Sequence, residues 1–471
     1  MKSITKKTKI VATIGPASSS KSTLKKMIRA GLNVARLNFS HGTHESHGEV
    51  YAAIQKASEE VRTPVAILQD LSGPKIRIGT FDDGQVMLKR GQTFTLMTKK
   101  IQGDAMRVYV NYAKLPREVS GGATLMMYDG KIQLEVVKTT NDSVVCKVIV
   151  GGVVSNNKGV NVPGGNLSIR SLTKKDRADV VFGIQNNVAF IALSFVRTAR
   201  DVQDLRKILD AQSSEAMIIA KVETQEAIQN IDEIIEAADG IMVARGDLAV
   251  EIGAEYVPAE QKRIIQQCNQ LGKPVITATQ MLDSMEVSSI PTRAEVSDVA
   301  NAILDGTDAV MLSGETATGA YPVESLRVMT RIAHTTEADY RNMNLEYLGT
   351  SKYIDDTVTS SVVRVANNVR ATAIVALTTS GRTARLISRF KPYHIIYAIT
   401  HDSLRQQQLL LSFGVEPLLE KTSHTIDKLV TDVKSIIRTK KIARKNDRVV
   451  VSAGMPFGQK GSTNMLVVVD I

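Results

Sequence analysis

The alternation of short apolar runs with amphipathic helical patterns is the feature that most constrains the fold of this chain. Apolar runs of four to six residues alternate with longer segments whose apolar residues recur every three or four positions. The first pattern predicts a strand buried on both faces, and the second predicts an amphipathic helix. Strands that alternate with helices form parallel sheets with helical crossovers, so the chain is predicted to be an α/β protein.

Eight strands of this kind are predicted, in two groups. Three lie before residue 75, at 9–14, 34–38 and 65–70, and five lie after residue 166, at 189–194, 217–222, 240–244, 274–278 and 308–312. Eight βα units can close on themselves, so the predicted fold class is an α/β protein with a (β/α)8 TIM barrel. A doubly wound open sheet is the alternative that the strand count leaves open.

Between the two groups of strands the pattern changes. From residue 75 to residue 166 short β patterns are separated by turn pairs such as Asp129-Gly130 and Gly151-Gly152, and no long amphipathic helix is evident. This predicts a small inserted β-barrel domain whose glycine-flanked ends act as hinges of a lid. From residue 345 onward helices and strands alternate again.

We therefore predict three domains. They are a catalytic barrel domain A at 1–74 and 167–344, an inserted β lid domain B at 75–166, and a C-terminal α/β domain C at 345–471.

Composition narrows the classes of function. The net charge is +11, but basic stretches such as 439–445 carry no aromatic residues, which argues against a single-stranded nucleic-acid partner. The two cysteines, Cys146 and Cys268, lie far apart and suggest no disulfide framework. No apolar run reaches the roughly 18 residues of a membrane span. We expect a cytoplasmic protein without a nucleic-acid or membrane partner.

Polar residues gather at the ends of the predicted strands, where barrel enzymes keep their active sites. Glu223 and Asp247 follow two neighbouring strands and form a pair of hard oxygen ligands of the kind that binds Mg²⁺. Arg36, Lys221 and Arg245 place cations beside them. Carboxylates and cations at one mouth suit phosphoryl transfer, which depends on positioning and on neutralising charge. The alternative is that Lys221 and Glu223 form an ion pair that closes the barrel and has only a structural role.

Another candidate site lies in the C-terminal region, where the loop 378–383 joins a predicted strand to a predicted helix. Hydroxyls and backbone N–H groups at a helix N-terminus can bind an anion. An ordinary N-cap by Thr379 or Ser380 is the alternative. The phosphate-binding loop GxxxxGK[ST] is absent from the sequence.

Eight strings, taken in order, resemble the pyruvate kinase family. They are TKIVATIGP (8–16), ARLNFSHG (35–42), GPKIR (73–77), KGVNVPG (158–164), IIAKVE (218–223), MVARGDL (242–248), ATQMLDSM (278–285) and MLSGETA (311–317). The resemblance implies a phosphotransferase that moves the phosphoryl group of phosphoenolpyruvate to ADP in the last step of glycolysis. It also implies a phosphorylated allosteric effector and, usually, a homotetramer. A different metal-dependent barrel enzyme that uses phosphoenolpyruvate or an oxo acid is the alternative.

The resemblance also assigns roles in the active site. Lys221, Arg36 and Thr279 would be catalytic, with Lys221 neutralising the phosphoryl group in transit and Thr279 relaying a proton to the enolate through water. The substrate-binding groups would be Arg36, Lys221, Gly246, Asp247 and Thr279. The divalent ion, Mg²⁺ with Mn²⁺ as a substitute, would be held by Glu223 and Asp247.

Two further sites follow from the same resemblance. The nucleotide would lie toward Asn38, His41, Arg77 and Lys158. The effector would bind at Thr378, Thr379, Ser380, Gly381, Arg382 and Thr383.

The sequence departs from the commoner family pattern at the pocket for a monovalent cation, whose positions are Asn38, Ser40, Asp70 and Leu71. Potassium-dependent members usually carry Thr in place of Leu71 and Glu in place of Lys75. A lysine ammonium is a compact cation with the charge of potassium. We therefore expect Lys75 to fill this pocket beside Asp70, so that K⁺ is not required. The alternative is that Lys75 points to solvent and K⁺ still binds.

Overall fold

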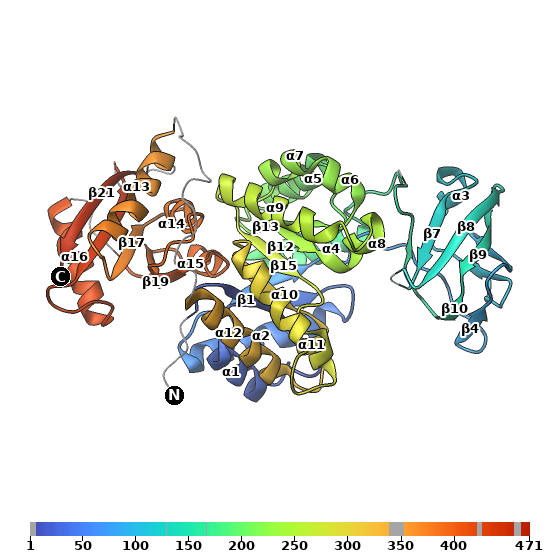
Figure 1. Cartoon of the computed structure of the whole chain (residues 1–471), viewed down its shortest axis with the longest axis horizontal. Helices are drawn as coiled ribbons and strands as arrows, with labels where there is room; N and C mark the ends of the chain where they lie inside the picture. The colour runs from blue at the N-terminus through green and yellow to red at the C-terminus, as the bar shows by residue number, and fades with distance from the viewer. Residues whose placement is uncertain (1–5, 129, 166, 339–352, 422–425, 456–462) are drawn as a thin grey trace.

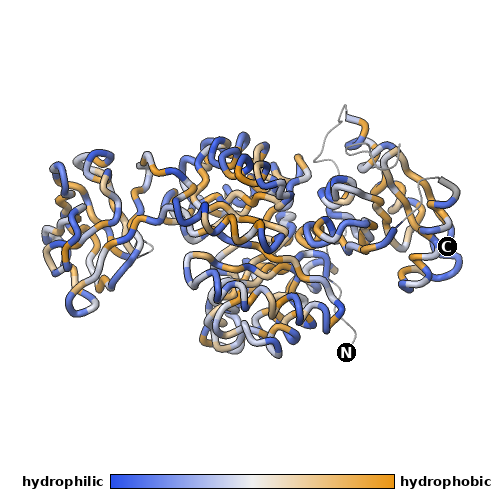
Figure 2. Tube along the Cα trace, turned by 180° about the vertical axis from the view of Figure 1, so that it is seen from behind, coloured by the Kyte–Doolittle hydropathy of each residue, from blue (hydrophilic) through white to orange (hydrophobic). Residues whose placement is uncertain are grey.

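The structure is a computed structural model that describes residues 6–128, 130–165, 167–338, 353–421, 426–455 and 463–471 (Figure 1). Three bodies lie in a row, with the barrel in the middle, the insert on one side and the C-terminal region on the other. Hydrophobic stretches run through the middle of the central body, and hydrophilic ones surround them (Figure 2). No helix in the described ranges combines the length and the hydropathy needed to cross a membrane.

The central body is a closed barrel of eight parallel strands. Around the barrel these are β1 (Lys9–Thr13), β2 (Val34–Asn38), β3 (Ala66–Asp70), β12 (Phe190–Leu193), β13 (Met217–Val222), β14 (Gly240–Ala244), β15 (Val275–Ala278) and β16 (Ala309–Leu312). All of their residues except Asn38 are buried, as expected for strands between a packed interior and a ring of helices. The predicted TIM barrel is confirmed, and the open-sheet alternative is wrong.

Helices cover the outside of the barrel. They are α1 (Lys21–Ala30), α2 (His44–Val61), α4 (Lys174–Gln185), α5 (Ala199–Ala211), α6 (Gln225–Gln229), α7 (Ile231–Ala237), α8 (Arg245–Ile252), α9 (Val257–Leu271), η1 (Asp283–Glu286), α10 (Arg293–Leu304), α11 (Gly314–Ala317) and α12 (Pro322–Ala338). The apolar stripe of Ile228, Ile231 and Ile235 predicts one helix over 225–238, but the structure has two, because the chain breaks at Asn230 (φ −106°, ψ 20°). The Asn230 side chain donates to the carbonyl of Arg197 at 3.0 Å, which fixes that break to the neighbouring loop.

The N-terminal end of the barrel is closed by the C-terminal region. Leu404, Leu410 and Leu411 pack into the same apolar cluster as the residues inside the barrel. Nearby, the buried Lys9 ammonium donates to the carbonyl of Val415 at 2.7 Å. This end is therefore packed with side chains, and the opposite mouth is left for chemistry.

The insert, called the lid below, has its own apolar core. Its elements are β4 (Gln85–Leu88), β5 (Thr93–Met97), β6 (Arg107–Tyr109), α3 (Leu115–Glu118), β7 (Thr124–Met127), β8 (Ile132–Thr139), β9 (Ser143–Val150), β10 (Gly152–Ser155) and β11 (Val160–Asn161). Six strands form one sheet, with β11 and β6 at its edges. The segment 76–79 bonds to both edges: Ile78 N–H donates to Lys158 O at 2.9 Å, and Gly79 N–H donates to Tyr109 O at 2.8 Å. These bonds tie the two edges of the six-stranded sheet together, and β10 pairs with β4 in a separate two-stranded sheet, so the predicted β character of the insert is confirmed.

The C-terminal region contains a five-stranded sheet in the order β19-β18-β17-β20-β21. Its elements are α13 (Ile354–Asn368), β17 (Ala373–Leu377), α14 (Arg382–Ser388), β18 (Ile396–Thr400), α15 (Ser403–Leu409), β19 (Val415–Leu419), α16 (Ile426–Thr439), β20 (Arg448–Gly454) and β21 (Thr463–Asp470). The predicted α/β character is confirmed. The sequence pattern alone does not predict β19, because Pro417 interrupts it, and a proline is tolerated there because β19 is an edge strand. The predicted domain start at 345 lies outside the described residues.

Candidate active site

Four charged side chains meet at the C-terminal mouth of the barrel. The Lys221 ammonium lies 2.9 Å from Glu223 Oε1 and 3.3 Å from Asp70 Oδ1. Arg36 donates from Nε to Asp70 Oδ2 at 2.6 Å. All four residues are at most 9% exposed, so two cations and two carboxylates form one buried chain of contacts, Arg36–Asp70–Lys221–Glu223.

The contacts in this chain keep its charges fixed. Burial by itself would lower the pKa of Lys221, but the carboxylates of Asp70 and Glu223 outweigh it and raise that pKa to about 12. Burial would likewise raise the pKa of Asp70, but Lys221 and Arg36 hold it below its usual range. Lys221 is thus a cation, and Asp70 an anion, throughout the neutral range.

Glu223 and Asp247 form a second feature of the mouth. Burial raises the pKa of Glu223; Lys221 opposes that rise, and the neighbouring Asp247 carboxylate adds to it. Glu223 Oε2 also accepts a hydrogen bond from the Phe195 backbone N–H at 2.7 Å. A nearby cation stabilises a carboxylate that is buried beside another carboxylate. One such cation is already present, because the Lys75 ammonium lies 3.6 Å from Asp247 Oδ1. The pair therefore fits a divalent ion.

The pair cannot complete such a site without other oxygen ligands. The part of the chain that the structure describes holds no group of three or more His, Cys, Asp or Glu side chains that could bind a metal. Mg²⁺ is commonly held by one or two carboxylates, with substrate oxygens and water as the remaining ligands. Glu223 and Asp247 match that arrangement.

Thr279 lies on a strained loop next to this pair. Thr279 (φ 69°) and Gln280 (φ 53°) both have left-handed backbones, which residues other than glycine seldom adopt. The Thr279 hydroxyl donates to Ala278 O at 2.6 Å and accepts from Gly246 N–H at 2.8 Å. Thr279 and Gly246 thus face each other across neighbouring strand ends.

The Arg245 guanidinium, expected beside the two carboxylates, instead contacts the loop that carries Thr279. Its guanidinium donates to Thr279 O at 2.7 Å and to Asp298 Oδ1 at 2.8 Å. The expectation that Arg245 places its charge beside the two carboxylates is therefore wrong. The guanidinium instead donates to the Thr279 carbonyl, which the left-handed turn leaves without a backbone hydrogen-bond donor.

The residues predicted for a monovalent cation are close together, with one exception. Asn38 Oδ1 accepts from Ser40 N–H at 3.1 Å, and the Leu71 carbonyl accepts from the Ser194 hydroxyl at 2.7 Å. Lys75, however, was expected beside Asp70, and its ammonium pairs with Asp247 instead. The two oxygens of Asp70 contact Arg36 and Lys221.

The four residues predicted for the nucleotide divide between two bodies. Asn38 and His41 lie at the end of β2, on the barrel. Arg77 and Lys158 lie in the lid, where the Arg77 guanidinium donates to Asn157 O at 3.0 Å and the Lys158 ammonium lies 4.4 Å from the centre of the Tyr128 ring. A ligand that contacted both pairs would bridge the lid and the barrel.

The structure places residues 378–381 of the C-terminal loop between β17 and α14, and Arg382 and Thr383 are the first residues of α14. Arg382 forms a two-pronged ion pair with Asp355 Oδ2, at 3.0 Å from Nε and 2.6 Å from Nη2. The Thr383 hydroxyl is buried and lies 2.7 Å from that of Thr463. Thr378, Thr379 and Ser380 are half-buried, and Arg382 is the exposed residue of this loop.

Sequence reasoning missed two residues that organise the mouth. The Ser194 hydroxyl accepts from the Lys221 ammonium at 2.8 Å, and the Thr13 hydroxyl accepts from Arg36 Nη1 at 2.7 Å. Thr13 ends β1, and Ser194 directly follows β12. The strand-end rule that selected the other residues would also have found these two, had it been applied to the first and fourth strands.

Comparison with known proteins gives a consistent result along the chain. The family model described as pyruvate kinase, barrel domain, matches residues 5–326, and that described as pyruvate kinase, alpha/beta domain, matches residues 356–469. A pyruvate kinase of Geobacillus stearothermophilus is 46% identical over 467 residues, covering 98% of this chain and 80% of the relative. One from Staphylococcus saprophyticus is 45% identical over 471 residues with the same coverages. The crystal structure of a pyruvate kinase from Cryptosporidium parvum has a TM-score of 0.93 and 36% identity, covering 99% of this chain and 96% of that one.

The carboxylate pair predicts a specific pattern of metal binding. Glu223→Gln and Asp247→Asn should each weaken Mn²⁺ binding about tenfold or more, because each removes a charged ligand while keeping the side-chain shape. Glu226→Gln is the matched control, since this nearby carboxylate lies 4.0 Å from Arg197 and is not one of the pair. Free Mn²⁺ is measured by electron paramagnetic resonance during titration. A variant that binds Mn²⁺ as tightly as the parent would remove its carboxylate from the site.

Proposed function

The chain belongs to the pyruvate kinase family, and on that premise we propose which of its residues carry out each part of the reaction. The chain is a phosphotransferase that moves the phosphoryl group of phosphoenolpyruvate to ADP, giving pyruvate and ATP. The observation that carries the residue assignment is the buried chain of contacts Arg36–Asp70–Lys221–Glu223 at the mouth. It supplies two fixed cations where a phosphoryl group with several negative charges must be held.

Lys221 and Arg36 are the proposed catalytic cations. Phosphoryl transfer is accelerated by positive groups that are already oriented toward the charge that develops in the transition state. The contacts of Lys221 with Glu223, Asp70 and Ser194 hold its ammonium in place before the substrate arrives. As the bond between phosphorus and the enol oxygen breaks, Lys221 would neutralise both the departing phosphoryl group and the enolate.

Glu223 and Asp247 are the proposed ligands of the divalent ion. Pyruvate kinases generally depend on Mg²⁺, and Mn²⁺ is the proposed substitute. When bound at these carboxylates, the ion supplies positive charge to the oxygens of phosphoenolpyruvate. Lys75 competes for the same Asp247 carboxylate, which supports a site that attracts cations.

Gly246, Asp247 and Thr279 are proposed to bind the carboxylate of phosphoenolpyruvate. Gly246 and Asp247 lie in the first turn of α8, where backbone N–H groups lack partners within the helix and attract anions. The Thr279 hydroxyl faces the same turn. After transfer, the enolate carbon needs one proton to become pyruvate, and we assign its relay from water to the Thr279 hydroxyl.

The remaining assignments concern the outer parts of the molecule. Asn38 and His41 on the barrel, with Arg77 and Lys158 on the lid, are proposed to bind ADP between the two bodies. The domain limits proposed above, 1–74 with 167–344, 75–166 and 345–471, are supported by the barrel, the two sheets of the lid and the C-terminal five-stranded sheet, because none of these sheets crosses a limit. We further propose that the enzyme works in the cytoplasm as a homo-oligomer, a tetramer in the usual family form.

Replacement of Lys221 tests the central assignment. Lys221→Met should raise the barrier by about 3–5 kcal/mol, on the order of 10²–10⁴-fold in turnover, because a preoriented cation beside the moving phosphoryl group is lost. Turnover is measured in a coupled assay for ADP-dependent pyruvate formation. The exposed Lys26→Met is the control, and Mn²⁺ titration together with circular dichroism checks that the variant is folded. Turnover within tenfold of the parent would show that Lys221 is structural.

We also propose that K⁺ is not required. Lys75 brings a fixed positive charge into the mouth, 3.6 Å from Asp247. The only ligand that Leu71 could give a cation is its backbone carbonyl, which already accepts a hydrogen bond from the Ser194 hydroxyl. A potassium ion would be repelled by an ammonium at short range.

The potassium proposal predicts full turnover in K⁺-free buffer, with Mg²⁺ present and tetrapropylammonium holding the ionic strength. Adding KCl should change turnover by less than about twofold, because the charge is already supplied. The double variant Leu71→Thr with Lys75→Glu should become activated by KCl. A strong rise on adding KCl to the parent would contradict the proposal.

The loop 378–383 is proposed to bind a phosphorylated effector through its hydroxyls, its backbone N–H groups and Arg382. Arg382 is paired with Asp355 and would have to exchange that carboxylate for the phosphate. Arg382→Ala should therefore abolish the response of turnover to sugar monophosphates and to a sugar bisphosphate, because it removes a two-pronged phosphate donor. Arg364→Ala, an exposed arginine on α13, is the control. Unchanged responses in Arg382→Ala would remove this loop from the effector site.

A further inference from the structure

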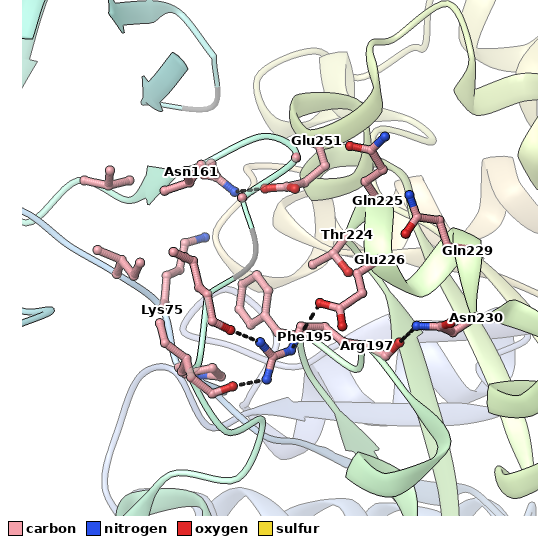
Figure 3. A pocket seen from close by; sticks show the side chains of 18 residues that line it. Lys75, Asn161, Phe195, Arg197, Thr224, Gln225, Glu226, Gln229, Asn230 and Glu251 are labelled. Atoms are coloured by element: carbon pink, nitrogen blue, oxygen red, sulfur yellow. Dashed lines mark hydrogen bonds and ion pairs between the residues drawn. The ribbon is translucent and has the colours of Figure 1, made fainter. Parts of the chain in front are cut away.

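A cavity of about 310 Å³ lies between the lid and the barrel, beside the mouth (Figure 3). Its walls come from both segments that connect the lid to the barrel, around residues 74–76 and 160–169, and from α6, α8 and the loop after β12. None of the groups assigned above to phosphoenolpyruvate, the divalent ion or ADP lines it. It is therefore a separate compartment next to the active site.

The lining is apolar on one side and polar on the other. Apolar surface comes from Ile76, Val160, Val162 and Phe195, and polar groups come from Asn161, Gln225, Glu226, Gln229 and Glu251. A concave site with a mostly apolar body and a few converging polar groups is typical of small-molecule sites. Its size suits a ligand with one ring and a short polar arm.

Most charges around the cavity already have partners. The Arg197 guanidinium donates to the carbonyls of Leu167 and Ile169 and lies 4.0 Å from Glu226 Oε2. The Lys75 ammonium is paired with Asp247. Glu226 therefore has a cationic partner, Arg197, on the wall of the cavity.

Glu251 is the exception. It forms no ion pair with any described residue; its Oε1 accepts a long hydrogen bond of 3.4 Å from the Asn161 amide, and the carboxylate also accepts from the Gln225 backbone N–H. Figure 3 shows this carboxylate pointing across one end of the cavity toward Asn161. Burial raises the pKa of Glu251 to about 7, and the nearby Asp247 carboxylate adds to the shift. A positive group placed here would relieve the cost of that buried charge.

We propose that this cavity binds a small organic cation, an amine on a flat apolar body, with the amine at Glu251 and the body against Phe195 and Ile76. The amine would donate to a carboxylate that lacks a cation, which gives selectivity for positive charge. Because both connecting segments line the cavity, a bound ligand would also tie the lid to the barrel.

Three probes that share a benzyl or phenyl body and differ in charge test the proposal on the full chain. Benzylamine should bind with a dissociation constant on the order of 0.1–1 mM, as expected of a ligand of this size. Benzyl alcohol should bind about tenfold more weakly, and benzoate should not bind. Isothermal titration calorimetry measures all three. Equal affinities for benzylamine and benzyl alcohol would overturn the proposal.

Methyl NMR locates the binding site without any substitution. Ile76 and Ile169 line the cavity, so their δ1-methyl groups serve as reporters, whereas Ile54 is a buried residue of α2. Benzylamine should shift the first two signals and leave that of Ile54 unchanged. Shifts confined to other isoleucines would place the ligand elsewhere and overturn the assignment.

A charge-neutral substitution then tests Glu251 itself. Glu251→Gln keeps the shape of the side chain and should weaken benzylamine about tenfold while leaving benzyl alcohol unchanged, because only the charge is lost. Glu59→Gln, an exposed glutamate on α2, is the control. If benzylamine binds Glu251→Gln as tightly as the parent, Glu251 is not the amine partner.

The pH dependence gives an independent check on the same group. Benzylamine stays protonated between pH 6 and pH 8, whereas Glu251, with its pKa of about 7, loses its charge as the pH falls. Affinity should therefore decrease from pH 8 to pH 6 in the parent and stay constant in Glu251→Gln. The other charged groups around Glu251 are Asp247 on its own helix and three residues that line the same cavity, Glu226 on α6, Lys75 at the start of the lid and Arg197 after β12. A parent affinity that does not change with pH would exclude the Glu251 carboxylate.

Discussion

The buried contacts Arg36–Asp70–Lys221–Glu223 are the interaction on which the rest of the active site depends. Charges removed from water are costly unless each meets an opposite charge at close range. Here every member has one, and the chain spans β2, β3 and β13 and the residue after β13. The barrel brings these strand ends to one mouth, so the closed sheet and the fixed charges support each other. The same contacts account for a lysine whose pKa rises and an aspartate whose pKa falls within one site.

Arginine side chains around this centre donate hydrogen bonds to backbone carbonyls that would otherwise lack donors. Arg245 satisfies the carbonyl of the left-handed Thr279, and Arg197 satisfies the Leu167 and Ile169 carbonyls where the chain returns from the lid. On the lid side, Glu118 accepts hydrogen bonds from the backbone and the hydroxyl of Ser168 at 3.1 and 2.5 Å. Both faces of the returning segment are thus anchored. The cavity beside it takes most of its polar groups from the barrel and most of its apolar groups from the lid.

Much of the fold follows from local pattern. Strands β2, β13 and β14 begin and end where periodicity predicts, because a strand buried on both faces is a continuous apolar run. The errors have local causes as well. Strand β19 contains a proline that its edge position tolerates, and the helix expected over 225–238 breaks at Asn230, whose side chain bonds to a residue remote in sequence. A pattern within one segment carries no information about such a partner.

The sequence by itself determined the barrel, the inserted lid, the C-terminal α/β region and the strand ends at which charged residues lie. It determined these because strand and helix periods are local, and because parallel strands in a barrel must end at one face. Only the tertiary structure decided which charges pair. Lys75 reaches Asp247 rather than Asp70, and Arg245 turns to Thr279 rather than to the carboxylate pair. Long side chains have several oxygens within reach, and the partner is chosen by distance and burial, which sequence order does not specify.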